Sequence, residues 1–314
     1  MTMEQNKAVL AARFVAAAKQ GRSSGPRGAH GTRTQVMAQA SRLGEIIWDL
    51  GYQMHDATQL REKHARAAFA ELRRRELSKG TLQNYARTMR FVMVGAGKTK
   101  MAEVLTNEVL QVSGRCRAGT KIAMTAETLS AARVEISKMK DQDKAVRLWL
   151  LIELSRRMGL RILEALCCSV HLKQWRKSIA QDGNADLHAG TKGSRPRSIF
   201  IQAELRQELL SVIDRAIKLL VRRRGKWVLW TASKKLENSL RTLSQAANKV
   251  GIKGEESWHS LRYVFATTQC EGYLAKEVDR ASALAFISSD LGHGDSRGRY
   301  VQHVYLRKKE KLEP

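Results

Sequence analysis

Apolar residues recur every three or four positions along the first third of the chain, which is the period of an amphipathic helix. One such stretch spans residues 34–50, and a second spans residues 65–72. A third helix is expected to open at Ser78 or Thr81, because either hydroxyl can cap a helix N-terminus. Together these stretches predict a helical domain over residues 30–112.

The rest of the chain keeps the helical period but contains one strand signal. Helices are expected over residues 144–158, 202–224 and 235–250. Residues 198–201 (Ser-Ile-Phe-Ile) follow a turn-rich stretch and are typical of a strand in a small antiparallel sheet. The predicted fold class is therefore mainly α, with an N-terminal helical domain and an α-rich domain over residues 121–314 that contains a small antiparallel β-sheet.

Two segments lack an apolar period, one before the first domain and one between the two domains. The Gly/Ser/Arg-rich stretch 21–28 has little reason to fold, so residues 1–29 are predicted to be a flexible basic N-terminal arm that includes a short helix. Residues 113–120 are short, basic and contain glycine. They are predicted to link the two domains.

Charge narrows the choice of partner. The 314-residue chain has 56 Lys and Arg against 30 Asp and Glu, a net charge of +26. The excess is +9 over residues 1–110 and +17 over the remainder, so both parts are basic. A charge of this size predicts a polyanionic partner, and DNA is the partner that both domains could grip. An RNA- or ribosome-associated protein is also permitted by charge alone.

The cysteines and the apolar runs bear on the compartment. No apolar run approaches the length that crosses a bilayer, and the four cysteines form no Cys-x-x-Cys pair. Reduced thiols in a cytoplasmic protein are therefore expected, with no membrane partner.

Four short segments carry the residue types that metal-free strand transfer on a DNA phosphate requires. A phosphodiester under attack spreads negative charge over its non-bridging oxygens, so such a site needs guanidinium groups, hydrogen-bond donors and a proton source. The candidates are Arg161 in Gly159–Leu166, Lys192 in Thr191–Gly193, His259 and Arg262 in Trp258–Arg262, and His293 in Leu291–His293, with Tyr300 and Tyr305 beyond.

The local sequence around these candidates favours a shared site. Arg161 follows Gly159, so it is expected at the start of a helix, where backbone N–H groups are free. His259 and Arg262 are three positions apart and therefore lie on one helix face. Gly292 lets the backbone approach closely beside His293, which can donate a hydrogen bond or accept a proton.

In this order the segments closely resemble the tyrosine recombinase (phage-type integrase) family. The matching patterns are Gly-Leu-Arg-x-x-Glu-hydrophobic-Leu from residue 159, His-x-x-Arg from residue 259 and Leu-Gly-His from residue 291. Residues 77–85 are also similar to the last-helix region of that family's core-binding domain. The resemblance implies a core-binding (SAM-like) DNA-binding domain at 30–112 and a catalytic domain at 121–314.

The resemblance also implies a role for each candidate. Arg161 and Arg262 would clamp the scissile phosphate, His259 and His293 would complete the cradle, and a tyrosine would form a 3′-phosphotyrosyl bond. Lys192 would protonate the 5′ leaving oxygen. No cofactor and no metal would be needed, because the covalent intermediate conserves the bond energy.

Two of these assignments leave alternatives open. Arg195 and Arg197 lie close enough to compete with Lys192. The position at which most relatives carry the tyrosine is Gln302 here, while Tyr300 follows His293 by seven residues and Tyr305 by twelve. We favour Tyr305, because residues 303–305 (His-Val-Tyr) resemble the family's usual ending and Tyr305 falls closer to the helical face of residue 302; Tyr300 stays the alternative.

The function implied is a site-specific recombinase or integrase that integrates or excises a mobile element. Its partners would be double-stranded DNA attachment sites, other copies of the chain in a tetramer on DNA, and a directionality factor. A type IB topoisomerase-like nicking enzyme and a catalytically decayed DNA-binding protein on the same scaffold are the alternatives. The short charged tail, residues 306–314, can bury little area against a neighbour, so the free protein is expected to be a monomer.

Overall fold

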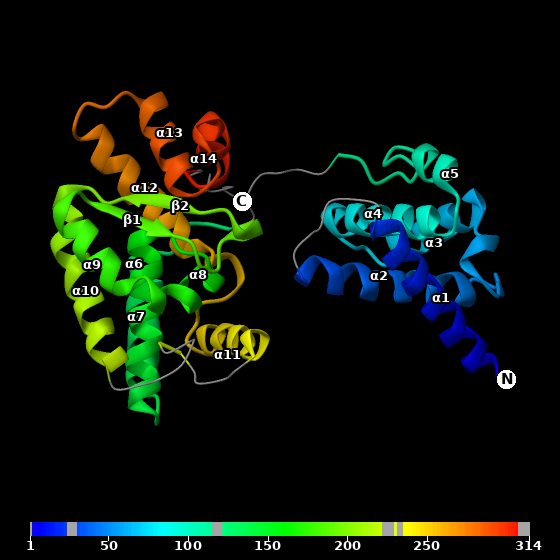
Figure 1. Ribbon diagram of the computed structural model, residues 1–314, viewed down its shortest axis with the longest axis horizontal. Coiled ribbons are helices and arrows are strands. Elements are labelled where there is room, and N and C mark those ends of the chain that lie inside the picture. The colour runs from blue at the N-terminus through cyan, green and yellow to red at the C-terminus, as the bar shows by residue number, and fades with distance from the viewer. Residues whose placement is uncertain (1, 24–29, 115–120, 222–228, 231–234, 307–314) are drawn as a thin grey trace, which may run out of the picture. The chain divides into compact units, whose positions relative to one another are not determined.

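A computed structural model gives the arrangement of most of the chain (Figure 1). It describes residues 2–23, 30–114, 121–221, 229–230 and 235–306. The chain divides into two compact units, Met1–Cys116 and Arg117–Pro314. The greater part of the predicted linker and most of the predicted C-terminal tail lie outside the described residues, so both stay predictions.

The N-terminal unit is helical throughout its described part. Its elements are α1 (Met3–Ser23), α2 (His30–Asp49), the 3₁₀ turn η1 (Ala57–Gln59), α3 (Glu62–Arg74), α4 (Lys79–Gly95) and α5 (Thr99–Val104). Helix α4 begins where the sequence predicts, because the Ser78 hydroxyl accepts a hydrogen bond from the Thr81 N–H. Helix α1 packs against both α2 and α4, and the three share one apolar core.

The predicted N-terminal arm is corrected by α1. Residues 3–23 form a long helix rather than a flexible segment, and Leu10 and Phe14 are fully buried in the core of the unit. Gly21 lies against α4, where an added Cβ would overlap the Phe91 carbonyl. The glycine therefore permits a close helix contact, and the sequence alone did not separate this role from chain flexibility. Residues 24–29 lie outside the described part.

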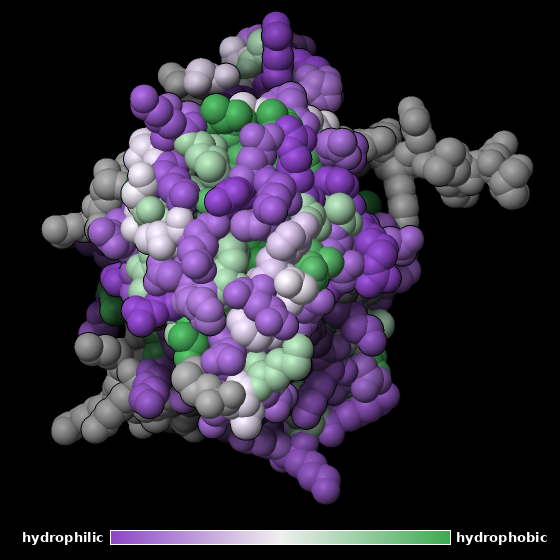
Figure 2. Space-filling model, turned by 90° about the vertical axis from the view of Figure 1, so that its right-hand side faces the viewer, coloured by the Kyte–Doolittle hydropathy of each residue, from purple (hydrophilic) through white to green (hydrophobic). Residues whose placement is uncertain are grey.

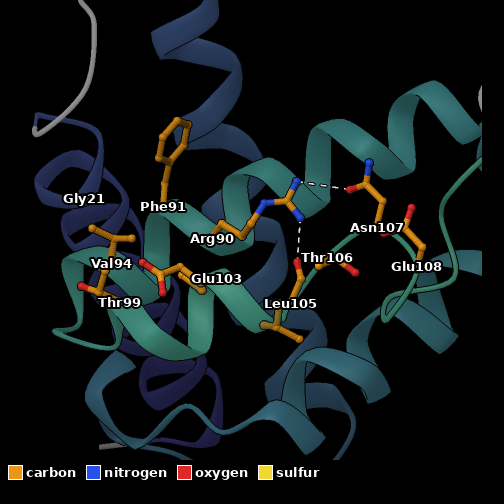
Figure 3. Close-up of a pocket in the computed structure, with 11 residues that line it drawn as sticks. Gly21, Arg90, Phe91, Val94, Thr99, Glu103, Leu105, Thr106, Asn107 and Glu108 are labelled. Carbon is orange, nitrogen blue, oxygen red and sulfur yellow. Dashed lines mark hydrogen bonds between the residues drawn. The ribbon is translucent and has the colours of Figure 1, made fainter.

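A pocket of about 620 Å³ opens between α1, α4 and α5 (Figure 3). Arg90 reaches across it and donates hydrogen bonds to the Leu105 carbonyl (2.7 Å) and to Asn107 Oδ1 (3.2 Å). These bonds fasten the segment after α5 to α4, and partial burial lowers the pKa of the Arg90 guanidinium. The pocket therefore belongs to the packing of the N-terminal unit.

The second unit is also helical, with one two-stranded sheet in its described part. Its elements are α6 (Ala126–Ser137), α7 (Gln142–Met158), α8 (Ile162–Cys167), η2 (Cys168–Val170), α9 (Leu172–Gln181), β1 (Asn184–Leu187), η3 (Lys192–Ser194), β2 (Arg197–Phe200), α10 (Ala203–Val221), α11 (Leu236–Lys249), η4 (Gly254–Glu256), α12 (Ser260–Leu274), α13 (Arg280–Asp290), η5 (Asp295–Arg297) and α14 (Gly298–Val304). The predicted fold class, mainly α with a small antiparallel sheet, is confirmed.

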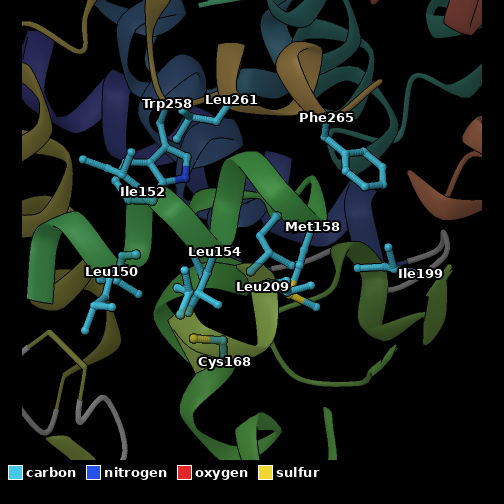
Figure 4. Packing of buried hydrophobic residues seen from close by; sticks show 14 of the residues in the cluster. Leu150, Ile152, Leu154, Met158, Cys168, Ile199, Leu209, Trp258, Leu261 and Phe265 are labelled. Carbon is cyan, nitrogen blue, oxygen red and sulfur yellow. The ribbon is translucent and has the colours of Figure 1, made fainter. Parts of the chain in front are cut away.

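Helix α7 lies at the centre of this unit. It is apolar around most of its circumference and contacts α6, α8, α10, α11 and α12, as expected of a helix buried on all sides. Figure 4 shows Ile152, Leu154 and Met158 of α7 among the buried side chains, with Trp258 and Phe265 near the start of α12 in the same cluster. The core thus fixes the end of α7 relative to the start of α12.

Strands β1 and β2 form an antiparallel hairpin in which Asn184 pairs with Phe200 and Leu187 with Arg197. Strand β1 packs against α9 and β2 against α13. The face of the molecule in Figure 2 is mainly hydrophilic, with apolar residues in small separate patches. Among the described helices, none has the length and hydropathy of a membrane-spanning segment.

Candidate active site

A glycine break places the first candidate arginine. Helix α7 ends at Gly159, whose φ of +59° is left-handed, and a Cβ there would lie 2.7 Å from the Phe265 ring. Glycine therefore allows the sharp turn that starts α8 immediately afterwards. Arg161 is the N-cap residue of α8, as the sequence predicts, and the Gly159 carbonyl is left free to accept hydrogen bonds from other segments.

Glu164 holds Arg161 in position. Its carboxylate accepts hydrogen bonds from the Arg161 backbone N–H (2.7 Å) and from Arg161 Nη1 (2.6 Å). Arg161 Nη2 donates to the Leu291 carbonyl (3.1 Å). The Arg161 side chain is still 22% exposed, so it can meet a ligand without leaving these bonds.

Arg262 comes to the same place from the first turn of α12. It is fully buried, donates from Nη1 to the Gly159 carbonyl and from Nη2 to the Leu291 carbonyl (2.9 Å), and its Nε has no hydrogen-bond partner within the described structure. Burial, with the nearby charge of Arg197, lowers the pKa of Arg262 to about 10. The side chain is thus a buried cation at neutral pH with a donor unused.

The Glu164 carboxylate is shared by three arginine side chains. Glu164 is fully buried, with ion pairs to Arg161 (2.6 Å), Arg197 (2.8 Å) and Arg262 (3.7 Å). Burial alone would raise its pKa, but the attraction of Arg197 and the other two arginines holds the pKa at about 2. Three positive charges against one negative charge leave the site electropositive. Such a site favours an anion.

The two histidines lie beside this cluster and both are neutral at pH 7. His259 immediately precedes α12 and is exposed, whereas His293 follows α13 and is half-buried. Desolvation of each imidazole by its neighbours, together with the charges of Arg262 and Arg161, lowers the pKa of each histidine to about 4. A neutral imidazole can accept a proton.

Tyr305 lies between the arginines and the histidines. It caps the C-terminal end of α14, is 3% exposed, and its hydroxyl is 3.1 Å from His293 Nε2, within hydrogen-bond distance. Its ring centroid lies 5.9 Å from Arg262 Cζ and 6.0 Å from the His259 ring. Its pocket therefore contains a base and a cation.

Tyr300 remains in the same neighbourhood. Its ring is 5.0 Å from that of His293, but the residue is 37% exposed. Partial burial raises the pKa of the Tyr300 hydroxyl. Among the described contacts, the hydrogen bond to His293 is made by Tyr305 and not by Tyr300.

Lys192 is the predicted residue that the structure leaves apart from this group. It is exposed in the η3 turn between β1 and β2, next to Gly193 with φ +69°. Within the described part of the chain no contact joins its amino group to the others. We call Arg161, His259, Arg262 and His293 the cradle, and residues 184–200 the hairpin.

Sequence reasoning missed how deeply Arg197 enters the site. It is 8% exposed, donates from Nη2 to Glu164 and to the Gly159 carbonyl, and donates from Nη1 to the Asp290 carbonyl. It shares the inward face of β2 with Ile199. An arginine in register with the apolar face of a predicted strand is a signal that could have identified it.

Comparison with known families agrees with this geometry. The family model described as "Integrase" matches residues 111–268, half of the chain, and the model described as "Phage integrase, N-terminal" matches residues 8–102. The first match ends before His293 and Tyr305. The case for these two residues therefore depends on the contacts described above.

Solved structures share the fold at low sequence identity. The XerH site-specific recombinase bound to palindromic difH substrate, in a post-cleavage complex, matches with a TM-score of 0.58 and 18% identity over 96% of this chain and 82% of that one. A lambda integrase dimer bound to a COC′ core site gives 0.59 and 16% over 97% and 80%. The Tn1549 transposon integrase with a circular intermediate DNA gives 0.55 and 15% over 93% and 95%. A search among curated proteins returned no match.

The identification combines two kinds of observation. Integrase family models cover most of the chain, and the segments that carry Arg161, Arg262 and His293 meet in one electropositive site. The chain belongs to the tyrosine recombinase (integrase) family.

Proposed function

We propose that this protein is a site-specific DNA recombinase that cleaves and rejoins DNA through a 3′-phosphotyrosyl intermediate, and so integrates or excises a mobile element. The observation that carries the proposal is the position of Tyr305. Its buried hydroxyl hydrogen bonds to His293 and its ring lies beside the Arg262 guanidinium. A nucleophile that is hydrogen-bonded to a base thus lies beside an anion-stabilising cation.

The first step is attack by Tyr305 on the scissile phosphate. The Tyr305 oxygen forms a bond to phosphorus as the bond from phosphorus to the 5′ oxygen breaks, and the phenolic proton passes to the neutral His293. Arg161 and Arg262 stabilise the negative charge that develops on the non-bridging oxygens, and His259 donates beside them.

The 5′ oxygen leaves with an electron pair and needs a proton. Lys192 is the donor we assign, because it lies on an exposed turn that can reach the leaving group when DNA is bound. A 5′ hydroxyl from a partner strand then attacks the phosphotyrosine and reverses the step. The protein adds no external energy, because the phosphotyrosyl bond replaces the phosphodiester.

The proposed function also implies that several copies of the chain assemble on DNA. Several of the similar structures hold DNA, and one is a lambda integrase tetramer bound to a Holliday junction. We expect this chain to bind double-stranded attachment sites and to form a tetramer on them, in the cytoplasm and with a possible directionality factor. The +26 charge, spread over both units, supports the DNA partner.

The test is covalent trapping. Binding sites are first selected from a random-sequence duplex pool and then rebuilt as nicked suicide substrates, and wild type, Tyr305→Phe and Tyr300→Phe are compared on denaturing gels. We expect an adduct with wild type and Tyr300→Phe and none with Tyr305→Phe. Loss of the adduct only in Tyr300→Phe would move the nucleophile to that residue.

Two further outcomes would replace the proposal. Tight DNA binding without an adduct from any of the three proteins would indicate a decayed, non-catalytic relative. An adduct with religation but no strand exchange between two duplexes would indicate a topoisomerase-like enzyme.

A further inference from the structure

The hairpin packs on α8, next to the cradle, through the backbone of Gly190. Gly190 has φ +75°, and an added Cβ would lie 2.6 Å from the Leu163 carbonyl and 3.0 Å from the Glu164 Cα. The segment before Lys192 thus lies directly on α8, the helix that begins at Arg161. The turn itself is open, because an added Cβ at Gly193 would meet nothing within 4 Å.

His171 holds the first end of the turn. Its Nε2 accepts hydrogen bonds from the backbone N–H groups of His188 (3.4 Å) and Ala189 (3.1 Å). The ring is buried and stacks on Trp175, with centroids 5.3 Å apart. Burial, with the nearby His188, lowers the pKa of His171, so the ring stays neutral and keeps its acceptor at neutral pH.

Arg197 holds the second end, where β2 begins. Its guanidinium donates to three acceptors on separate segments: the Gly159 carbonyl (3.2 Å), Glu164 (2.8 Å) and the Asp290 carbonyl. The turn before His293 packs on the same side chain, since a Cβ at Gly292 would lie 2.8 Å from Arg197 Cδ. One side chain thus ties the hairpin to the turns that carry Arg161 and His293.

The far end of β2 is fastened to the same place. Asp290 Oδ1 accepts a hydrogen bond from the Phe200 backbone N–H (3.0 Å). With Asp290 bonded at both ends of the strand, β2 cannot slide along α13 without losing buried hydrogen bonds. The exposed segment between these attachments is 192–196, which contains Lys192.

We propose that His171 and Arg197 are positioning residues that fix the two ends of this turn, so that Lys192 is delivered to the leaving 5′ oxygen. The inference rests on the proposed function, in which Lys192 supplies that proton. The two residues act through Lys192 and have no contact with the reacting phosphate. Loss of His171 should therefore affect proton delivery to the leaving group and spare the cradle's stabilisation of charge, whereas loss of Arg197, which also bonds to Glu164, should affect both.

A substrate with sulfur in place of the bridging 5′ oxygen separates these two effects. In such a substrate the bond from phosphorus to sulfur breaks and a thiolate leaves with the electron pair. It can leave without being protonated, because a thiolate, whose conjugate thiol has a pKa of roughly 8.5, is a much weaker base than an alkoxide. Cleavage that depends on Lys192 becomes independent of it, whereas cleavage that depends on the cradle arginines does not.

Single-turnover cleavage of the oxygen and sulfur substrates is measured for wild type, His171→Phe, His171→Gln and Arg197→Lys. His171→Phe keeps the aromatic stack and loses the acceptor, while His171→Gln keeps an acceptor near the Nε2 position. We expect His171→Phe to be slowed about 10²-fold on the oxygen substrate, the lower range for loss of general acid catalysis, and to lie within a few-fold of wild type on the sulfur substrate. Arg197→Lys, which also alters the contact with Glu164, should be slowed on both substrates, and more on the oxygen one. His171→Gln should be slowed less than His171→Phe.

Two controls bracket the result. Ser198→Ala alters the outward neighbour of Arg197, whose hydroxyl bonds to Asp186 within the hairpin, and it should cleave both substrates like wild type. Arg262→Lys should be slow on both. Melting curves and DNA affinity identify a variant that fails to fold, and if Arg197→Lys is lost in this way the two His171 variants decide.

The outcomes are distinct from those of the proposed function. Equal slowing of His171→Phe on both substrates, or no slowing on either, overturns the positioning inference while wild-type cleavage leaves the recombinase proposal standing. Failure of wild type to cleave either substrate overturns the proposed function, and the inference with it.

Discussion

The cradle and the hairpin lie on one unit but are built in opposite ways. Arg262 of the cradle is fully buried, and its Nη1 and Nη2 groups donate to the backbone carbonyls of Gly159 and Leu291. Lys192 of the hairpin is exposed on an open turn. The cradle is therefore preorganised before any ligand arrives, whereas the hairpin is fixed on either side of an exposed turn that carries Lys192.

This difference matches the roles proposed for the two parts. Charge that appears in a transition state is best met by dipoles and cations already in place, because then nothing has to reorganise during the reaction. A proton for the leaving group is needed only at one moment, and a donor on an exposed turn can be brought to the leaving oxygen when DNA binds. The comparison predicts that substitutions in the two regions respond differently to the leaving group.

The largest effect is expected in the cradle. Arg262→Ala or Arg161→Ala should slow cleavage by on the order of 10²–10³, the usual cost of losing one oriented donor to a developing oxyanion. The slowing should be similar with oxygen and sulfur leaving groups, and much of the DNA affinity should remain, because each arginine stabilises charge that develops only in the transition state. Single-turnover rates and filter binding measure both. Recovery of an arginine variant on the sulfur substrate would erase the distinction between the regions.

The next effect belongs to the hairpin. Lys192→Ala should slow cleavage of the oxygen substrate by about 10²-fold and leave the sulfur substrate close to wild type, since only the first leaving group needs a proton. Arg195→Ala, three residues away on the same turn, is the matched control. If Arg195→Ala is instead slow on the oxygen substrate and close to wild type on the sulfur substrate, the proton donor would be Arg195. The assignment of Lys192 would then be wrong.

The contrast also explains what the sequence could predict. The helical periods located α2, α3, α4 and α7, and the ordered motifs identified the residues of the cradle, because both signals are local. The prediction of the N-terminal arm failed at Gly21, since a glycine at a helix contact and a glycine in a flexible segment look alike in sequence. Packing partners distant in the chain decide between them.

Arg197 shows the same limit inside the site. In sequence it was one of three basic residues within a turn, but its burial depends on Gly159, Glu164 and Asp290, which lie up to 93 positions away. The choice of Tyr305 over Tyr300 likewise depends on where α14 ends, and it stays a prediction until trapping is done.

Asp290 joins the two regions, and its ionisation should be visible in stability. Burial raises the pKa of its carboxyl to about 7. As pH rises from about 4, the carboxyl ionises in the unfolded chain but stays protonated in the folded one, so the free energy of unfolding falls, by up to about 1.4 kcal/mol per pH unit. Asp290→Asn should remove this contribution, so that its stability relative to wild type improves between acid and neutral pH. Urea titrations of both proteins measure it, and parallel pH profiles would contradict the burial argument.

The smallest effect concerns the histidines of the cradle and their response to DNA. The pKa of His293 is lowered to about 4 by burial and by the charges of Arg262 and Arg161. A bound phosphate compensates those charges and should raise the pKa of His293 in the complex, so binding takes up a proton and affinity should increase as pH falls from 7. The increase should stay below about tenfold per pH unit, the limit for uptake of one proton. Fluorescence anisotropy at fixed ionic strength measures the DNA affinity at each pH. His293→Gln should flatten the dependence of affinity on pH. Lys192→Ala, a change confined to the hairpin, should keep it. A slope that disappears with Lys192→Ala would mean that the hairpin and not the cradle senses the phosphate.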